Sequence, residues 1–128
     1  MSILKIYQGR ALQAALAEIV RPVQVNYLAL DQPEPATVQA VADLIKLTPY
    51  LSVNTQQEPA AEADRIIIRT AEGRELVFVG PPVGNELAAL VSAIIVAGRG
   101  KSGLLPATRR ALTNIHRPMH LAVFTTPT

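Results

Sequence analysis

The chain has 128 residues, of which 49% are hydrophobic, with a net charge of +2 and no cysteine. A chain of this length fits one domain that buries roughly two thirds of its unfolded surface. Without cysteine it can form no disulfide, no thiolate nucleophile and no zinc–sulfur site. The N-terminus reaches polar residues too soon for the apolar stretch of a signal peptide, so we expect a cytoplasmic protein.

The charge is distributed unevenly along the chain. Residues 1–86 hold seven Lys/Arg and ten Asp/Glu, a net charge of −3, whereas residues 87–128 hold five basic residues and no acid. This basic segment is either a solvated face or a surface that steers an anionic partner, nucleic acid or an acidic protein face. Phe124 is its only aromatic residue. Nucleic acid is therefore the weakest of these partners, because few side chains are available to stack on bases.

Apolar periodicity predicts a helix over residues 2–20, a strand over 23–30 and a second helix after the loop 31–35. Ser2 can cap the first helix, Pro22 closes it, and Thr48-Pro49 ends the second. The predicted core faces are Leu4, Tyr7, Ala11, Leu12, Ala15, Leu16 and Ile19 in the first helix, and Val38, Val41, Ala42 and Ile45 in the second.

The second half of the chain predicts a short strand over 51–54, a polar connection over 56–63 and a hairpin of strands 65–70 and 75–79. A third helix begins at Glu86. From residue 87 to residue 97 only Ser92 is not apolar, a run too short to cross a membrane, which indicates a helix buried on more than one side. A fourth helix over 106–115 and a strand over 119–125 follow; the helix is expected to carry Thr108, Ala111, Leu112 and Ile115 on one face, with Arg109 and Arg110 outside.

This order gives a βαβ unit followed by a ββα unit, with an extra N-terminal helix and an extra C-terminal helix. The βαβ crossover requires parallel strands, and the hairpin adds antiparallel ones. We therefore expect an α/β protein with a thioredoxin-like mixed sheet. The connection over 56–63 leaves room for about one turn of helix, so the usual middle helix is reduced to a loop.

A glycine-rich segment at residues 98–103 has the composition of a phosphate-binding loop. It lacks the first glycine of that motif, because Ile95 stands at the required position, and it follows a helix rather than a strand. We interpret it as a helix C-cap and a linker.

Two further clusters contain residue types that are common in catalytic or metal sites. His116 and His120 are four residues apart, but Pro118 forbids a regular helix between them and no carboxylate is near in sequence. The acidic residues of loop 58–64 have no partner nucleophile or base, which indicates a solvated loop; they are Glu58, Glu62 and Asp64. We therefore assign no catalytic, cofactor-binding or metal-binding residue.

The segment over residues 78–86 carries the most distinctive motif, Phe-x-Gly-x-Pro-x-Gly-x-Glu. Its glycines and prolines turn a strand into a buried helix. With the apolar helix and glycine-rich end that follow, it resembles the N-terminal domain of the flavoprotein component of bacterial alkyl hydroperoxide reductase. The match extends from the first helix, which ends before Arg21-Pro22-Val23, to Ile115-His116 and the closing strand.

The resemblance implies two thioredoxin-like folds in tandem, ahead of FAD- and NADH-binding domains. The first fold lacks redox cysteines, and the second begins with a strand that leads into a Cys-x-x-Cys pair. Residues 1–118 would be the first, non-catalytic fold, and residues 119–128 the first strand of the second, truncated before the cysteines. Thioredoxin folds have a proline before the third strand, where this chain has Asp64, and loop 31–35 has no thiol. Related tandem-thioredoxin disulfide oxidoreductases share this layout, so the subfamily stays open.

We therefore expect a non-catalytic scaffold domain of a thiol–disulfide oxidoreductase, a disulfide reductase that passes electrons to a peroxiredoxin. It would orient the following redox fold through helix 86–98 and through the sheet edge offered to strand 119–125. FAD and NADH would belong to the parent protein, and no cofactor is expected in this chain. The alternative is an independent interaction module that docks an acidic partner through basic segment 99–117. The expected partners are a second thioredoxin-like fold or a second copy in a homodimer, and not a membrane.

Overall fold

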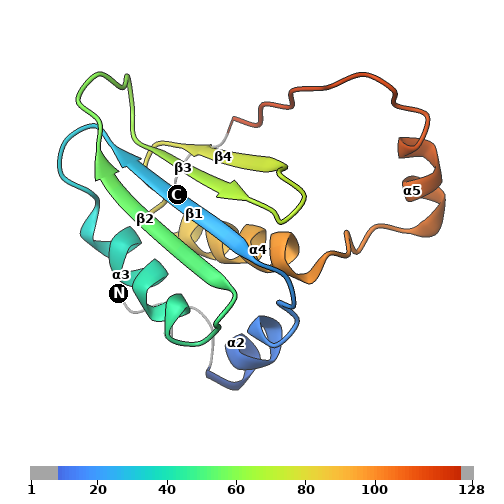
Figure 1. The fold of residues 1–128 in the computed structure, drawn as a ribbon, viewed down its shortest axis with the longest axis horizontal. Helices are drawn as coiled ribbons and strands as arrows, with labels where there is room; N and C mark the ends of the chain where they lie inside the picture. Colours follow the sequence, from blue (N-terminus) through green and yellow to red (C-terminus); the bar gives the residue numbers. More distant parts are fainter. Residues whose placement is uncertain (1–8, 125–128) are drawn as a thin grey trace.

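The computed structural model of the chain describes residues 9–124, and their side chains from residue 11 onward. Figure 1 shows a twisted sheet with α3 and α4 packed against it and α5 set apart from the rest. The elements in chain order are α2 (Gly9–Leu16), β1 (Val23–Ala29), α3 (Pro35–Ile45), β2 (Leu51–Gln57), β3 (Arg65–Arg69), β4 (Glu75–Val79), α4 (Asn85–Arg99) and α5 (Pro106–Leu112).

The four strands found in residues 9–124 form one sheet in the order β2-β1-β3-β4. β1 and β2 are parallel, with Val23 opposite Leu51, and α3 is the crossover between them. β3 runs antiparallel to both β1 and β4. The β3–β4 turn uses Gly73 at φ 84°, a left-handed conformation that glycine adopts without strain. The predicted mixed sheet, its βαβ and ββα units and its hairpin are confirmed.

The hydrophobic core lies on one face of this sheet. Alternate residues of β1 are buried, and two of them, Val25 and Tyr27, are paired across the ladder with the buried Ile68 and Ile66 of β3. Helix α4 contributes seven buried residues, and each large apolar side chain among them stabilises the fold by roughly 1.5–3 kcal/mol. The buried residues of α4 are Leu87, Leu90, Val91, Ile94, Ile95, Ala97 and Gly98.

The first helix ends at Leu16, four residues before the predicted end. After it the chain turns toward α4, where the backbone N–H groups of Val20 and Arg21 both donate to the carbonyl oxygen of Gly98 at 3.1 Å. Of the predicted core face, Leu12, Leu16 and Ile19 are buried, Ala15 is half-buried and Ala11 is exposed. Ser2, Leu4 and Tyr7 lie outside the described residues.

Helix α3 buries a different face from the predicted one. It turns Thr37, Ala40, Val41 and Leu44 into the core, so that only Val41 was predicted correctly. The Thr37 hydroxyl donates to the carbonyl oxygen of Pro82 at 2.7 Å in a buried contact, which fixes the rotation of the helix. Val38 and Ile45 remain 37% and 40% exposed. Both faces of the helix carry apolar residues, so periodicity alone did not separate them.

Strand β2 continues to Gln57, beyond the predicted end at residue 54. β2 is the edge strand of the sheet, so the polar side chains of its last residues need not be buried. Its parallel ladder with β1 continues as far as the pair Ala29 and Gln57. The connection over 58–64 contains no helix, as predicted.

The C-terminal part of the chain differs most from the prediction. Every residue from 101 to 124 is exposed, α5 ends at Leu112, and residues 119–124 form no strand. The predicted core face of the fourth helix is therefore not buried, with Leu112 and Ile115 47% and 46% exposed. A strand needs a neighbour for its hydrogen bonds, and the described residues supply none here. That residues 119–128 begin a following fold stays a prediction.

Gly98 provides a test of the packing between α4 and the segment after α2. A Cβ added there would lie 2.6 Å from Ile19 Cγ2 and 3.0 Å from Val23 Cγ2. Overpacking typically costs about 1–3 kcal/mol, whereas alanine gains only about 1 kcal/mol over glycine inside a helix. We expect Gly98→Ala to lower the free energy of unfolding by about 1 kcal/mol in urea denaturation.

The matched control is Ala89→Leu, which adds carbon atoms at an exposed position of the same helix. It should change the free energy of unfolding by less than about 0.5 kcal/mol. A Gly98→Ala protein as stable as the unsubstituted chain would contradict the close packing at Ile19.

Candidate functional site

Three loops meet at one edge of the sheet, where β1 and β2 both end. The loop after β2 is joined to β1 by the N–H of Glu58, which donates to the carbonyl oxygen of Ala29 at 2.7 Å. The loop after β4 is joined to the start of β3 by the N–H of Gly80, which donates to the carbonyl oxygen of Asp64 at 2.7 Å. The carboxyl ends of parallel strands are the usual place for a site in an α/β sheet. We therefore take this edge as the candidate site.

Tyr27 and Asp64 fix the geometry of this edge. The Tyr27 ring is buried on β1, and its hydroxyl donates to Asp64 Oδ2 at 2.7 Å. The other carboxylate oxygen, Oδ1, accepts the backbone N–H of Leu30 at 2.9 Å. The Tyr27 hydroxyl oxygen in turn accepts the backbone N–H of Glu34 at 3.0 Å. Both ends of loop 30–34 are thus tied to one tyrosine and one aspartate.

The Tyr27 hydroxyl is a fixed hydrogen-bond donor at neutral pH. Burial raises the pKa of Tyr27 to about 12; the N–H of Glu34 opposes this shift, and the neighbouring Asp64 carboxylate adds to it. A phenol with so high a pKa keeps its proton and neither attacks nor accepts a proton from a substrate. Its role here is to hold the loop.

Two loops at this end of the sheet contain five acidic residues. The sequence placed three of them, Glu58, Glu62 and Asp64, in one acidic loop, and the fold adds Asp31 and Glu34 from the loop after β1. Within the described part of the chain, no group of three or more His, Cys, Asp or Glu residues is placed to hold a metal ion. With no cysteine in the chain, this edge offers no thiol.

The other two sequence candidates lie elsewhere. The glycine-rich segment at 98–103 is a helix end, as predicted, because Gly100 caps α4 with φ 72° in the left-handed region. His116 and His120 are exposed in the segment that follows α5.

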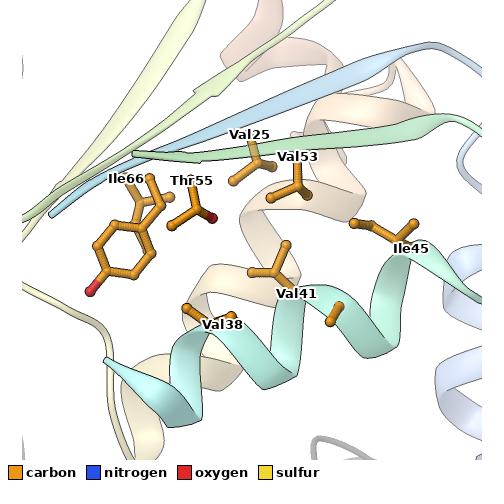
Figure 2. A pocket seen from close by; sticks show the side chains of 9 residues that line it. Val25, Val38, Val41, Ile45, Val53, Thr55 and Ile66 are labelled. Atoms are coloured by element: carbon orange, nitrogen blue, oxygen red, sulfur yellow. The ribbon is translucent and has the colours of Figure 1, made fainter. Parts of the chain in front are cut away.

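An apolar groove runs between α3 and the sheet, beside this edge (Figure 2). Its volume of about 210 Å³ is below the roughly 300–1,000 Å³ of small-molecule sites. The four α3 residues predicted as core line this groove instead, so it is the surface that the rotated helix leaves open. The lining residues are Val25, Tyr27, Val38, Val41, Ala42, Ile45, Val53, Thr55 and Ile66.

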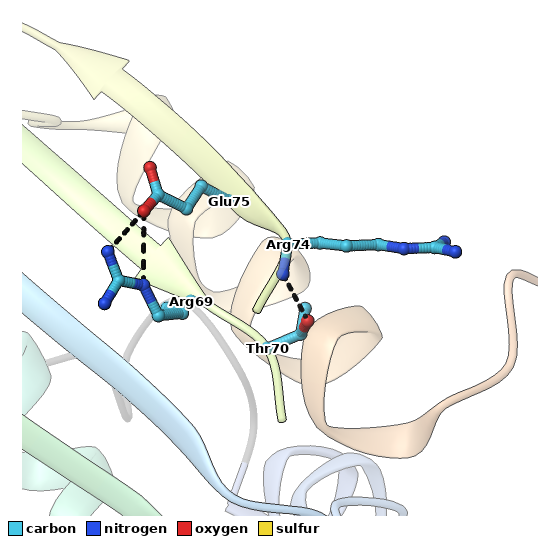
Figure 3. A network of polar contacts seen from close by, with 4 residues as sticks. All are labelled: Arg69, Thr70, Arg74 and Glu75. Atoms are coloured by element: carbon cyan, nitrogen blue, oxygen red, sulfur yellow. Dashed lines mark hydrogen bonds and ion pairs between the residues drawn. The ribbon is translucent and has the colours of Figure 1, made fainter. Parts of the chain in front are cut away.

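No helix connects β2 to β3, so among residues 9–124 no helix covers the sheet face opposite the core, which we call the open sheet face. Ile67 and Val77 are paired across β3 and β4 on this face, and Leu28 and Val79 lie near them in the ladder. Val77 is 48% exposed and Val79 70%. At the hairpin end Arg69 forms an ion pair with Glu75, and the N–H of Arg74 donates to the Thr70 hydroxyl at 3.1 Å (Figure 3).

Helix α4 exposes little of the apolar surface that the sequence led us to expect on it. That helix packs on the sheet and on the segment after α2, and its exposed large apolar side chain is Val96, at 40%. An interaction with another fold through α4, as the sequence suggested, would therefore find little apolar area.

Comparison with known proteins gives structural matches only. No known family model and no curated protein matches the sequence. The alkylhydroperoxide reductase protein AhpF from Enterococcus faecalis matches with a TM-score of 0.66 at 16% identity, over 82% of this chain and 57% of that one. A protein disulfide oxidoreductase from Aeropyrum pernix matches with a TM-score of 0.56 at 25% identity, over 82% and 52%. The chain thus spans little more than half the length of these structures.

The structure is therefore a thioredoxin-like domain. The N-terminal domain of the E. faecalis protein also matches by itself, with a TM-score of 0.64 at 16% identity over 79% of this chain and 56% of that one. The resemblance found in the sequence is confirmed at the level of the fold. In residues 9–124, no helix has the length and hydrophobicity to span a bilayer.

Removing the Tyr27 hydroxyl should loosen the edge of the sheet. Tyr27→Phe leaves an Asp64 oxygen and the Glu34 N–H without their partner, so we expect a loss of about 1–3 kcal/mol in the free energy of unfolding at pH 7. Burial, with a smaller contribution from Asp64, raises the pKa of Tyr27 from 10.0 to about 12 in the folded protein, so the stability linked to the protonated phenol is fully present below pH 10. The unsubstituted protein should lose that stability as the pH rises from 10 to 12. The free energy of unfolding of Tyr27→Phe should not show this loss, because phenylalanine does not titrate.

Urea denaturation at pH 7 and across the alkaline range measures both effects. Tyr50→Phe, at a position 43% exposed, is the control and should change little. Equal stability of Tyr27→Phe and the unsubstituted protein at pH 7 would show that the Tyr27–Asp64 bond does not hold this loop.

Proposed function

We propose that the chain is a non-catalytic scaffold domain of a cytoplasmic thiol–disulfide oxidoreductase. It would orient a neighbouring thioredoxin-like fold with a Cys-x-x-Cys pair, which passes electrons to a peroxiredoxin. FAD and NADH would bind to other domains of such a parent protein. The observation that carries this proposal is the Tyr27–Asp64 network, which fixes loop 30–34 at the edge where a redox loop would lie.

Two features of the chain support a role without chemistry. Disulfide exchange requires a thiolate, and the chain has no cysteine. The loop that would have to approach a substrate disulfide is held at both ends by backbone N–H groups bonded to Asp64 and Tyr27. A rigid loop without a nucleophile suits a domain that supports its neighbour.

The open sheet face is the surface through which the domain would hold its neighbour. Its apolar side chains come from three adjacent strands and include Ile67, Val77 and Val79. In thioredoxin folds with a middle helix that helix would lie on this face; here its place is free. Interfaces between domains of one chain typically bury about 600–1,500 Å², within reach of a four-stranded sheet face.

The chain alone should be inactive as a disulfide reductase. In an insulin-reduction assay with dithiothreitol, we expect the rate with the chain to equal the rate of dithiothreitol alone, because no thiolate is available. A protein preparation free of thioredoxin that accelerates the reaction would contradict the proposal.

The scaffold role itself is tested by binding. A Cys-x-x-Cys thioredoxin-like domain from the same organism should bind the chain, as measured by titration calorimetry, and Val77→Asp should weaken this binding at least tenfold by placing a charge in the interface. The control is Val20→Asp, which changes a valine 58% exposed after α2. Binding that is equally sensitive to both changes, or to neither, would argue against the open sheet face.

A second candidate function is an interaction module that docks an acidic partner through basic segment 99–117. The observation that favours it is the exposure of Lys101, Arg109, Arg110 and Arg117 on a segment with no acid. A polyglutamate chain should then shift the NMR signals of these residues in a salt-dependent way. Duplex DNA should bind only weakly, with a Kd of about 10⁻⁴–10⁻⁶ M near physiological salt. Submicromolar DNA binding that survives added salt would point to nucleic acid instead.

A further inference from the structure

Residues 101–124, which we name the C-terminal arm, expose an apolar stripe. Leu105, Thr108, Leu112 and Ile115 follow the spacing of one helix face through α5, and Leu105 is 72% exposed. All four are exposed in the part of the chain that the structure describes. An exposed apolar helix face of this kind is typical of a segment that packs against another molecule.

The groove beside α3 has the complementary character. Its walls are apolar, and Val38 and Ile45 on its rim are 37% and 40% exposed. At one end Tyr27 lines the groove and bonds Asp64, so the groove opens onto the acidic edge of the sheet. The arm carries a net charge of +4 with no acid, whereas residues 9–99 carry −3. Grooves of this type bind amphipathic helices through residues at i, i+3 and i+7.

We propose that the groove of one copy receives the C-terminal arm of a second copy, and that two chains exchange arms in a two-fold dimer. In such a dimer the stripe of α5 contacts the groove, while Arg109 and Arg110 face the carboxylates of the acidic edge. Two-fold symmetry makes the contact twice, once for each chain. The pairing depends on neither a redox parent nor a following fold.

The arm leaves its own domain in a direction that favours a second copy. Arg99 donates from Nε to the carbonyl oxygen of Lys101 at 2.8 Å and pairs with Glu18 at 3.6 Å, which holds the base of the arm beside α2 and α4. From there only residues 101–105 lead to α5. Figure 1 shows α5 and α3 at opposite ends of the long axis of the molecule. The arm of another copy is therefore better placed to fill the groove than the chain's own.

Two pairs of charge reversals test the exchange. A chain with Arg109→Glu and Arg110→Glu carries −2 in place of +2 on α5 and keeps the acidic edge. A chain with Glu58→Lys and Glu62→Lys keeps the basic arm, and the charge of the five acidic positions of its edge changes from −5 to −1. Each variant alone should dimerise at least tenfold more weakly than the unsubstituted chain. Mixed together they should form a heterodimer, since the unaltered basic arm then meets the unaltered acidic edge, and the two acids placed on α5 meet the two lysines placed in the loop after β2.

Analytical ultracentrifugation over a concentration series measures these equilibria, with native mass spectrometry to identify the heterodimer. The matched control is a chain with Arg69→Glu and Arg74→Glu, two reversals at exposed positions of the β3–β4 hairpin end, away from both surfaces. It should dimerise like the unsubstituted chain. The double variant Leu112→Asp and Ile115→Asp should abolish the dimer. It should still fold, because both side chains are exposed and do not belong to the hydrophobic core.

Three results would overturn the proposal. One is that the unsubstituted chain stays monomeric up to millimolar concentration, whether its arm is free or folds back onto its own groove. Another is a dimer that the arm variants do not weaken. The last is a mixture of the two charge-reversed chains that forms no heterodimer.

Discussion

The register of β1 is the constraint on which the rest of the structure depends. Its alternate residues face α3 and α4, and the ladders to β2 and β3 extend that face across the sheet. A slip of one residue would turn Val25 and Tyr27 to the open side. The same register places the Tyr27 hydroxyl at the edge where β1 ends, within 2.7 Å of Asp64. Core and candidate site therefore follow from one strand.

The missing middle helix accounts for both distinctive surfaces near the site. A connection of seven residues, 58–64, takes the chain from β2 to β3 along the edge and brings Asp64 to Tyr27. The same shortness leaves Ile67 and Val77 without a helix above them. The short connection therefore places a carboxylate at this edge and also leaves the sheet face without a helix over it. The proposed scaffold role accounts for both consequences.

The features that depend on local sequence pattern were predicted correctly. The features that depend on contacts between residues far apart in the sequence were missed. Alternation and turn residues were sufficient for β1, β3 and β4, the hairpin at Gly73 and the cap at Gly100. The rotation of α3 depends on a bond between Thr37 and Pro82, 45 residues apart, and the acidic edge on a bond between Tyr27 and Asp64, 37 apart. No periodicity encodes such pairs. One signal of the Tyr27–Asp64 bond was present in the sequence. Tyr27 is the one buried residue of β1 whose side chain has a polar end, and a buried tyrosine hydroxyl usually has a hydrogen-bond partner.

The unequal distribution of charge along the chain has a structural counterpart. The acidic part folds into the domain and places five of its ten acidic residues in the loops at one edge, while the basic part forms an arm whose described residues are all exposed. Exposed leucines raise the free energy of the arm in water, and a surface that covers them lowers it. The open sheet face has Arg65 and Arg69 among its side chains, so the basic arm is matched poorly there and well by the groove that ends at Asp64. The two surfaces can therefore serve different partners at once, a neighbouring fold on the sheet and a second copy in the groove.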